Sequence, residues 1–367
     1  MFSRSLLAAA ISLLLASQAH AASKAAVDQN GTGNASVISQ SVGPNNTATL
    51  QQSGELNETT VTQAGAQLVF SAQQYGTDNT ISSDQQGFDS HANLYQQGEG
   101  NTQTLNQQTE VGGHYADVSQ IGSFNQATID QVDQYNGGTI YQEGSGHVLA
   151  LEQSDQFNSL NARQEGADNL TMVNQSGSGY AQTRQNGTGN IIDLGQSAQM
   201  SYAGASVTQT GQYNEATVSQ AGGGRYDGGR IDLTQDGTSN RAEIRSSVSM
   251  GSIGLAQTGT GNEVFAEQAG IDNGIRGSST GDNNLMDISQ DGLMNTLDLT
   301  QSGSDNVIEA TQGSYSYTGD AGVVDQVGTG NYASLTQGVN VHEYGLSNSA
   351  TIVQNGSDNT AIVAQGL

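Results

Sequence analysis

Hydrophobic and polar residues alternate strictly along many short segments of this chain. In NQATIDQ (125–131), Asn, Ala, Ile and Gln occupy one set of alternate positions, and Gln, Thr and Asp occupy the other. A period of two residues is typical of a β-strand, whereas a helix would repeat its apolar residues every three or four positions. NEATVSQ (214–220) and NTLDLTQ (295–301) follow the same rule. The pattern therefore predicts an all-β fold whose strands bury Ala, Ile, Val and Leu on one face.

A six-residue motif, Q-x-G-x-x-N, recurs along the chain and joins these segments. It occurs 15 times, with Ser279 in place of the Gln in one copy and His147 in place of the Asn in another, and successive copies are mostly 22 residues apart. A glycine at a fixed place in a short connection indicates positive φ, or a close approach that a side chain would block. The glycine is present in every copy, at Gly31, Gly54, Gly76, Gly98, Gly122, Gly144, Gly166, Gly187, Gly211, Gly237, Gly259, Gly281, Gly303, Gly328 and Gly356. We therefore interpret the motif as a tight turn between two strands.

Asn and Gln recur at the ends of the predicted strands. Side-chain amides both donate and accept hydrogen bonds, so equivalent amides in neighbouring repeats can satisfy one another. The predicted ladder residues are Gln29, Asn34, Gln40, Gln52, Asn57, Gln63, Gln74, Asn79, Gln85, Gln96, Asn101, Gln107, Gln120, Asn125, Gln131, Gln142, Gln164, Asn169, Gln185, Asn190, Gln209, Asn214, Gln235, Asn240, Gln257, Asn262, Asn284, Gln301, Asn306, Gln326, Asn331, Gln354, Asn359 and Gln365. We expect these residues to act in folding and templating.

Two strands and two turns make one rung of about 22 residues. The fold class that follows is a flattened β-solenoid, similar to a parallel β-helix, with about 15 strand–turn–strand rungs. We expect residues 22–28 to form a short lead-in and 29–367 to form the solenoid. Ser246 and Ser279 replace a ladder Gln, and Gly277 leaves an inward position empty, so this region is predicted to be less protected.

The first 21 residues have the features of a secretory signal peptide. Arg4 gives a positive start, residues 6–16 are apolar, and Ala19-His20-Ala21 matches a cleavage site. The apolar run is too short to span a bilayer, and no later segment approaches that length. We therefore expect an exported protein that is not integral to a membrane.

The composition of the chain narrows the kinds of partner and of stabilising interaction that it can have. The formal net charge of −26 disfavours nucleic acid as a partner, because nucleic acid needs a basic footprint. The chain has no Cys, so no disulfide can staple it. Hydrophobic residues are only 34% of the chain, and the amide ladders would explain how it folds without a large core.

No motif indicates catalysis or a cofactor. His91, His114, His147 and His342 are scattered and lack metal-ligand spacing. The G-T-G-N loops open strands, whereas a phosphate-binding loop opens a helix. We therefore predict no catalytic site, no cofactor and no metal site.

Calcium remains an alternative at the fixed turns. The fifth motif position holds Asp78, Asp168, Asp305 and Asp358 in four of the 15 copies. Stacked Asp-rich turns bind Ca²⁺ in some solenoids. Solvated turn residues are the preferred interpretation, because most copies lack the carboxylate.

The terminal half-units are as regular as the internal ones. NTAIVAQ (359–365) follows the strand pattern without change, and solenoids that stay soluble usually carry atypical capping repeats. Exposed strand edges recruit further strands, so stacking of one chain on the next would give an open fibre.

The strands N-x-A-x-V-x-Q and the turns Q-x-G-x-x-N resemble the curlin repeat of curli subunits, from Gln29 to Gln365. The resemblance implies a secreted bacterial amyloid of the biofilm matrix, on the surface of a Gram-negative cell, used in adhesion. It implies partners of three kinds: further copies of the chain in a homopolymer, a nucleator subunit and an outer-membrane export pore. It fits either a major subunit or a nucleator. The alternative function is a soluble monomeric β-solenoid that binds a surface, a polysaccharide or Ca²⁺.

Overall fold

The computed structural model describes residues 12–14, 23–41, 43–223, 229–315, 318–338 and 347–366. Strands account for 79% of the chain, and the described residues contain no helix. The parallel strands form a β-solenoid of about 14 turns, which confirms the predicted fold class. The chain divides into two compact units, 1–172 and 173–367. Of the predicted signal peptide, only β1 (Ser12–Leu14) lies within the described residues, and His342 lies outside them.

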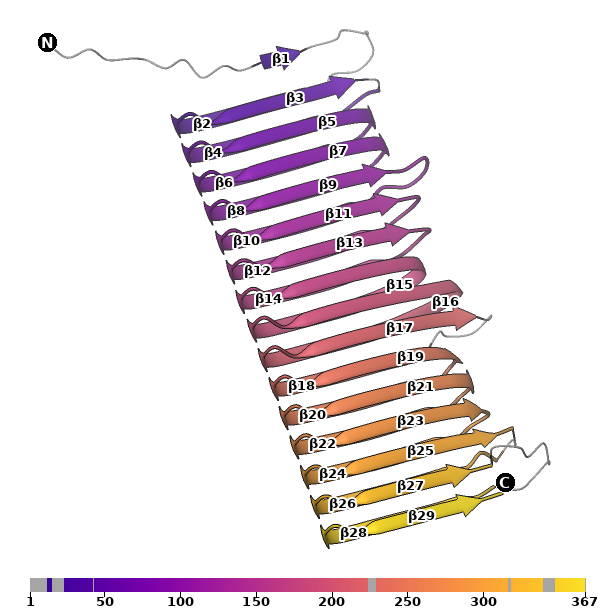
Figure 1. Ribbon diagram of the computed structural model, residues 1–367. Helices are drawn as coiled ribbons and strands as arrows, with labels where there is room; N and C mark the ends of the chain where they lie inside the picture. Colours follow the sequence, from indigo (N-terminus) through magenta and orange to yellow (C-terminus); the bar gives the residue numbers. More distant parts are fainter. Residues whose placement is uncertain are drawn as a thin grey trace, which may run out of the picture. The chain divides into compact units, whose positions relative to one another are not determined.

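Unit 1 consists of two parallel sheets, between which the chain alternates (Figure 1). The even-numbered strands are β2 (Lys24–Thr32), β4 (Thr47–Glu55), β6 (Val69–Thr77), β8 (His91–Glu99), β10 (Tyr115–Ser123), β12 (Gly137–Ser145) and β14 (Ser159–Ala167). The odd-numbered strands are β3 (Ala35–Ser41), β5 (Glu58–Ala66), β7 (Thr80–Phe88), β9 (Thr102–Gln108), β11 (Gln126–Val132) and β13 (Val148–Ser154). β1 pairs in parallel with β3.

Unit 2 repeats this arrangement, and the chain enters it within β15 (Leu170–Thr188). Strand β16 (Ile191–Gln212) is long enough to pair with a strand of each sheet. One sheet continues with β18 (Arg230–Thr238), β20 (Ser252–Thr260), β22 (Gly274–Asp282), β24 (Thr296–Ser304), β26 (Ala321–Thr329) and β28 (Ser349–Ser357). The other continues with β17 (Glu215–Gly223), β19 (Arg241–Ser249), β21 (Glu263–Ile271), β23 (Leu285–Gly292), β25 (Val307–Ser314), β27 (Tyr332–Gln337) and β29 (Thr360–Gln365).

The register aligns equivalent residues of successive rungs. In β10 and β12, for example, Gln120 lies beside Gln142 and Gly122 beside Gly144. Because side chains alternate across a strand, this register stacks all inward positions in columns. The inward columns hold small and aliphatic residues such as Ala48 and Leu50, which are at most 1% exposed. The core is therefore a thin layer between two sheets, as the alternation predicted.

The fixed turn requires glycine for two reasons at once. Gly54 has a φ of +122°, which L side chains rarely adopt. A Cβ on Gly54 would also overlap the carbonyl oxygen of Gly76 in the next rung. Positive φ and close approach therefore act together at this position, whereas the motif alone left the two reasons as alternatives.

The fifth motif position of the fixed turn is also left-handed, but it accepts other residues. Phe124 has a φ of +57°, and its ring lies where a Cβ on Gly100 would be. Tyr213 lies in the same way over Gly189, and Leu56 over Gly33. The side chain at the fifth position thus packs against the fifth position of the preceding rung. A glycine in the preceding rung leaves space for a large side chain in the following one.

Alanine at Gly144 tests the close packing of the turns. A Cβ there would overlap the Gly166 carbonyl at a φ of +131°, so we expect local opening to become easier by about 2 kcal/mol or more. Native-state hydrogen exchange of the β12 and β14 amides measures this change. Gly137 in the same strand is the matched control, because no atom lies within 4 Å of its Cβ position. Equal losses of protection in both variants would contradict the explanation.

Candidate functional site

Glutamine side chains form hydrogen-bonded ladders inside the solenoid. Gln74 is fully buried, and its Nε2 donates to Oε1 of Gln96 at 2.9 Å, while its Oε1 accepts from Nε2 of Gln52 at 2.8 Å. The same Nε2 also donates to the carbonyls of Glu58 and Asn79, at 3.1 and 2.9 Å. Each amide therefore joins three rungs and satisfies backbone groups at the strand ends.

Two glutamine ladders run through each unit, one beside each kind of turn. In unit 1 the first joins Gln29, Gln52, Gln74, Gln96, Gln120, Gln142 and Gln164, and the second joins Gln40, Gln63, Gln85, Gln107, Gln131 and Gln153. In unit 2 the first includes Gln185, Gln209, Gln235 and Gln257, then Gln301, Gln326 and Gln354. The second includes Gln175, Gln196 and Gln220, then Gln268, Gln290, Gln312, Gln337 and Gln365. The donor always lies on the N-terminal side of its acceptor.

Asparagine side chains form a further ladder at the fixed turn, with the opposite donor direction. Oδ1 of Asn79 accepts from the backbone N and from Nδ2 of Asn101, at 3.1 and 3.0 Å. Nδ2 of Asn79 donates to Oδ1 of Asn57 and to the Gly98 carbonyl, both at 3.0 Å. Each predicted asparagine of this kind thus binds both the glycine carbonyl and the Asn backbone N–H of the following copy of the turn.

Sequence reasoning missed a second asparagine ladder beside the variable turn. It contains Asn46, Ser90, His114, Asn136, Asn158, Asn273, Asn295, Asp320 and Asn348, linked by side-chain bonds to the next backbone N. Segments such as NTLDLTQ (295–301) begin with an Asn of this second ladder, so the sequence did carry a signal for it in the second half of such repeats. The prediction also omitted the second-ladder glutamines from Gln153 to Gln337.

The two serines that replace ladder glutamines leave gaps in the ladders. Ser279 is too short to reach Gln301, and the buried Oε1 of Gln301 has no hydrogen-bond partner among the described residues. Ser246 precedes Gln268, whose Oε1 is also buried without a partner. Gly277, in contrast, leaves no empty space, because a Cβ there would meet the side chains of Leu255 and Met286. The expectation of an empty position at Gly277 was therefore wrong.

Two buried histidines take the place of asparagine in the ladders. The Nδ1 atom of His147 lies 3.3 Å from the backbone N of Asn169, and Nε2 lies 3.1 Å from the Glu143 carbonyl. A neutral imidazole can accept at Nδ1 and donate at Nε2, which reproduces both roles of an Asn amide. Burial lowers the pKa of His147 below 6.5, against the hydrogen bond to Glu143 and the charge of Asp168. His114 has the same arrangement with Asn136, and burial lowers its pKa too.

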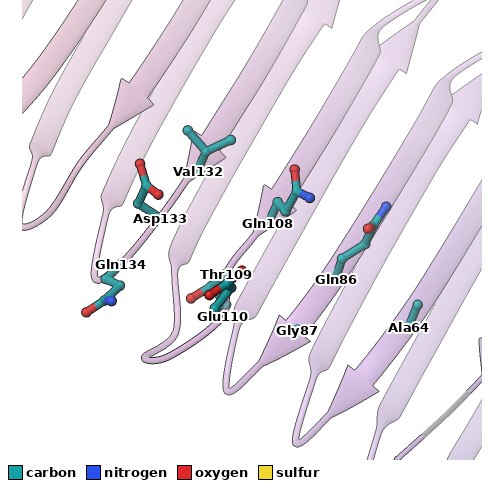
Figure 2. Close-up of a pocket in the computed structure, with 9 residues that line it drawn as sticks. All are labelled: Ala64, Gln86, Gly87, Gln108, Thr109, Glu110, Val132, Asp133 and Gln134. Carbon is teal, nitrogen blue, oxygen red and sulfur yellow. The ribbon is translucent and has the colours of Figure 1, made fainter.

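The described residues hold no group of three or more His, Cys, Asp or Glu side chains arranged to bind a metal ion. Figure 2 shows an open groove at the variable-turn edge of unit 1, and its labelled side chains include two carboxylates, Glu110 and Asp133. The groove-lining residues include no His, Cys, Lys or Arg. No described helix is long and apolar enough to cross a membrane.

The fold and its ladders define a class: a parallel β-solenoid held together by side-chain amides that repeat in every rung. Within this class, residues 22–54 and 43–76 match the curlin associated repeat. This match confirms the resemblance to the curlin repeat within residues 22–76, and the repeat points to a curli-related structural protein. No curated protein gives a significant match to the chain.

Glutamine at Ser279 is expected to close one gap in the ladder. The new amide could accept from Gln257 and donate to the unpartnered Gln301 oxygen, which should stabilise β22 and β24 by about 1 kcal/mol. Hydrogen exchange of these strands measures the gain. Glutamine at the adjacent outward Ser278 is the control, and an equal gain in both variants would argue against a ladder effect.

Unit 1 is expected to lose stability as the pH falls below 6.5. The lowered pKa means that the folded state binds protons less readily than the unfolded state. The contribution of the two neutral histidines to stability is therefore complete above pH 6.5, and it is lost as the pH falls through their folded-state pKa. Protonated Nδ1 would also face the Asn169 N–H group. Replacing both His114 and His147 with Asn should flatten the pH dependence of hydrogen exchange in β12 to β14. An unchanged slope would contradict the assignment.

Proposed function

We propose that this chain is a structural subunit of extracellular curli-like amyloid fibres, and that it assembles by stacking of terminal rungs. The observation that carries the proposal is the match between the ladder groups of the first and last described rungs. The curlin repeat supports the family context, and the predicted signal peptide supports export.

Once the predicted signal peptide has been removed, and with it the β1 strand that pairs with β3, the first and last described rungs expose complementary hydrogen-bonding groups. Gln29 and Gln40 donate forward to the next rung, and their Oε1 atoms accept from no described residue. At the other end, Oε1 of Gln354 and of Gln365 each accepts a hydrogen bond from a glutamine of the preceding rung. Nε2 of Gln354 donates only to the Tyr332 carbonyl of the preceding rung, and Nε2 of Gln365 donates only to the Ser349 carbonyl of its own rung. Internal glutamines of the same kind, such as Gln63, make that bond and still donate forward. The last rung can therefore donate to the first rung of another copy.

The asparagine ladder also matches between the last and first rungs, but here the first rung would donate the hydrogen bond and the last rung would accept it. Oδ1 of Asn359 accepts from no described residue, whereas internal asparagines at this place, such as Asn79, accept from the backbone of the following rung. Asn34 would supply that backbone N in a second copy. Stacking two first rungs would instead set glutamine acceptor against acceptor, and stacking two last rungs would set donor against donor. The donor directions therefore favour head-to-tail growth. Such growth does not close on itself and gives a fibre.

The proposal places the fibre at the surface of a Gram-negative cell, in adhesion and biofilm matrix. Its partners are further copies of the same chain, a nucleator subunit and an outer-membrane export pore. The buried ladder residues and turn glycines then have two roles, because the contacts that hold rungs together inside one copy also bind the next copy.

Alanine at Gly356 tests the stacking geometry. Gly356 lies in the last rung, where its Cβ position has only Asn359 Nδ2 nearby, at 3.5 Å. In a stack, the same Cβ would overlap the Gly31 carbonyl of the next copy, as each internal glycine would overlap its neighbour. We expect elongation to slow by at least about tenfold, equivalent to about 1.4 kcal/mol, while the fold of unit 2 is kept.

Elongation is measured by thioflavin T fluorescence with seeds, and stacking by the ~4.8 Å fibre reflection. Alanine at Gly261 is the control for positive φ, because only the flexible Asn283 side chain lies against it. Normal elongation of the Gly356 variant would show that the proposed end contact is wrong. A wild-type chain that stays monomeric, without the reflection, would overturn the fibre function in favour of a soluble binding protein.

A further inference from the structure

Two tyrosine rings from successive rungs of unit 1 lie in contact on one outer face. Tyr75 belongs to β6 and Tyr95 to β8, which are neighbouring strands of the same sheet (Figure 1). The register places Gln73 opposite Tyr95 and Tyr75 opposite Gln97, so the two tyrosines are diagonal neighbours. Their ring centres are 5.9 Å apart and their planes are tilted by 48°, a separation at which aromatic rings attract one another. The register of the sheet therefore builds the contact.

The surrounding hydrogen bonds hold the two rings in place. Gln74 directly precedes Tyr75, and its side chain donates to that of Gln96, which directly follows Tyr95, at 2.9 Å. The Tyr75 hydroxyl donates to Gln51 at 3.1 Å, and the Tyr95 hydroxyl donates to the Gln97 side chain at 2.7 Å. Both tyrosines are half-buried, so part of each ring faces solvent. The pair is therefore fixed in contact and still accessible to small solutes.

The other tyrosines of unit 1 have no such neighbour. They are Tyr115, Tyr135 and Tyr141. The ring of Tyr135 stacks on Phe157, with the ring centres 5.3 Å apart. Tyr141 lies in the same column as Tyr95 but two rungs away, with Ser119 between them. Within the described part of unit 1, Tyr75 and Tyr95 are therefore the pair of tyrosines in ring contact.

Two phenol rings in contact can undergo a covalent reaction that an isolated tyrosine cannot. A one-electron oxidant removes one electron and one proton from each phenol, and the two radicals join through ring carbons next to the hydroxyl groups. The new C–C bond replaces two ring C–H bonds, whose protons return to the phenolic oxygens. With hydrogen peroxide as the electron acceptor, two tyrosines and one peroxide give one dityrosine and two water molecules. Rings that are already in contact have a large advantage in such a coupling step.

The composition of the chain leaves few competing oxidation reactions. There is no Cys to form a disulfide and no Trp to be oxidised in place of tyrosine. Methionine takes up an oxygen atom when it is oxidised and forms no link to another residue. Coupling of tyrosines is therefore the oxidative cross-link between rungs that this sequence permits.

We propose that Tyr75 and Tyr95 form an oxidative cross-linking site, which a haem peroxidase with hydrogen peroxide converts to dityrosine. The bond joins two rungs that otherwise have only non-covalent contacts with each other. A cross-link that closes a loop of the chain restricts the unfolded state, and so the bond locks β6 and β8 together. The reaction takes place within one chain, so this inference does not depend on the proposed fibre function.

The test oxidises the purified mature chain with a haem peroxidase and hydrogen peroxide, at low protein concentration and without fibre seeds. We expect a monomer that has lost two hydrogen atoms, as measured by mass spectrometry. Trypsin cannot locate the link, because no Lys or Arg lies between Lys24 and Arg163. Cleavage before Asp residues yields the peptides 28–77, with Tyr75, and 89–116, with Tyr95. The cross-link should join these two peptides.

Two variants remove the hydroxyl groups and keep the rings. Tyr75→Phe and Tyr95→Phe should each lower the yield of joined peptides at least about tenfold. Tyr115→Phe is the matched control and should leave the yield unchanged, because Tyr115 lies in the same peptide as Tyr95 but opposite His91. An unchanged yield in Tyr75→Phe, or an equal loss in Tyr115→Phe, would overturn the proposal. Joined peptides that occur only in dimers or fibres would assign the bond to contacts between copies and would also overturn it.

A second measurement tests the locking of the two rungs. After oxidation, amide hydrogen exchange in β6 and β8 should be at least about tenfold slower in the wild-type chain than in Tyr75→Phe. Before oxidation, the two chains should exchange at similar rates, because the substitution keeps the ring. Equal exchange rates in the two oxidised chains would overturn the locking role of the bond.

Discussion

The hydrogen bond between stacked side-chain amides is the interaction on which this solenoid depends. Gln74 shows why: one buried amide bonds to the glutamines above and below it and to two backbone carbonyls. A buried amide without these partners would be strongly destabilising, so each rung requires its neighbours in correct register. The thin aliphatic layer between the sheets then needs to supply only part of the stability. A chain with only 34% hydrophobic residues can fold for this reason.

The same dependence explains where the molecule is vulnerable. Ser246 and Ser279 each remove one link, and the structure responds with an unpartnered oxygen on the following glutamine rather than with a rearranged backbone. His147, in contrast, keeps the link, but only in its neutral form. A ladder link is thus kept by a side chain that places an acceptor opposite the next backbone N–H, such as His147, Ser90 or Asp320. It is lost where the side chain is too short to reach, as at Ser279.

Much of the fold could be predicted from sequence because the period-two pattern and the 22-residue repeat are independent signals that agree. NQATIDQ (125–131) defined both the strand and its inward face, and Gly122 defined the turn before it. The second asparagine ladder escaped because its positions vary: Ser90, His114 and Asp320 share geometry but not identity.

The left-handed fifth position of the fixed turn has one more consequence. Phe124 occupies the space above Gly100, and Tyr213 the space above Gly189, so each large residue fits only one kind of predecessor. If the rungs stacked one repeat out of register, Phe124 would lie over Asp78 in place of Gly100, and Tyr213 would lie over Asp168 in place of Gly189. A side chain already occupies the space at both of these aspartates. The backbone, which is nearly the same in every rung, does not by itself prevent such a shift of register. Leu56, Phe124 and Tyr213 therefore disfavour a one-rung shift at their own positions, and they fix the order of stacking in a chain whose backbone is nearly periodic.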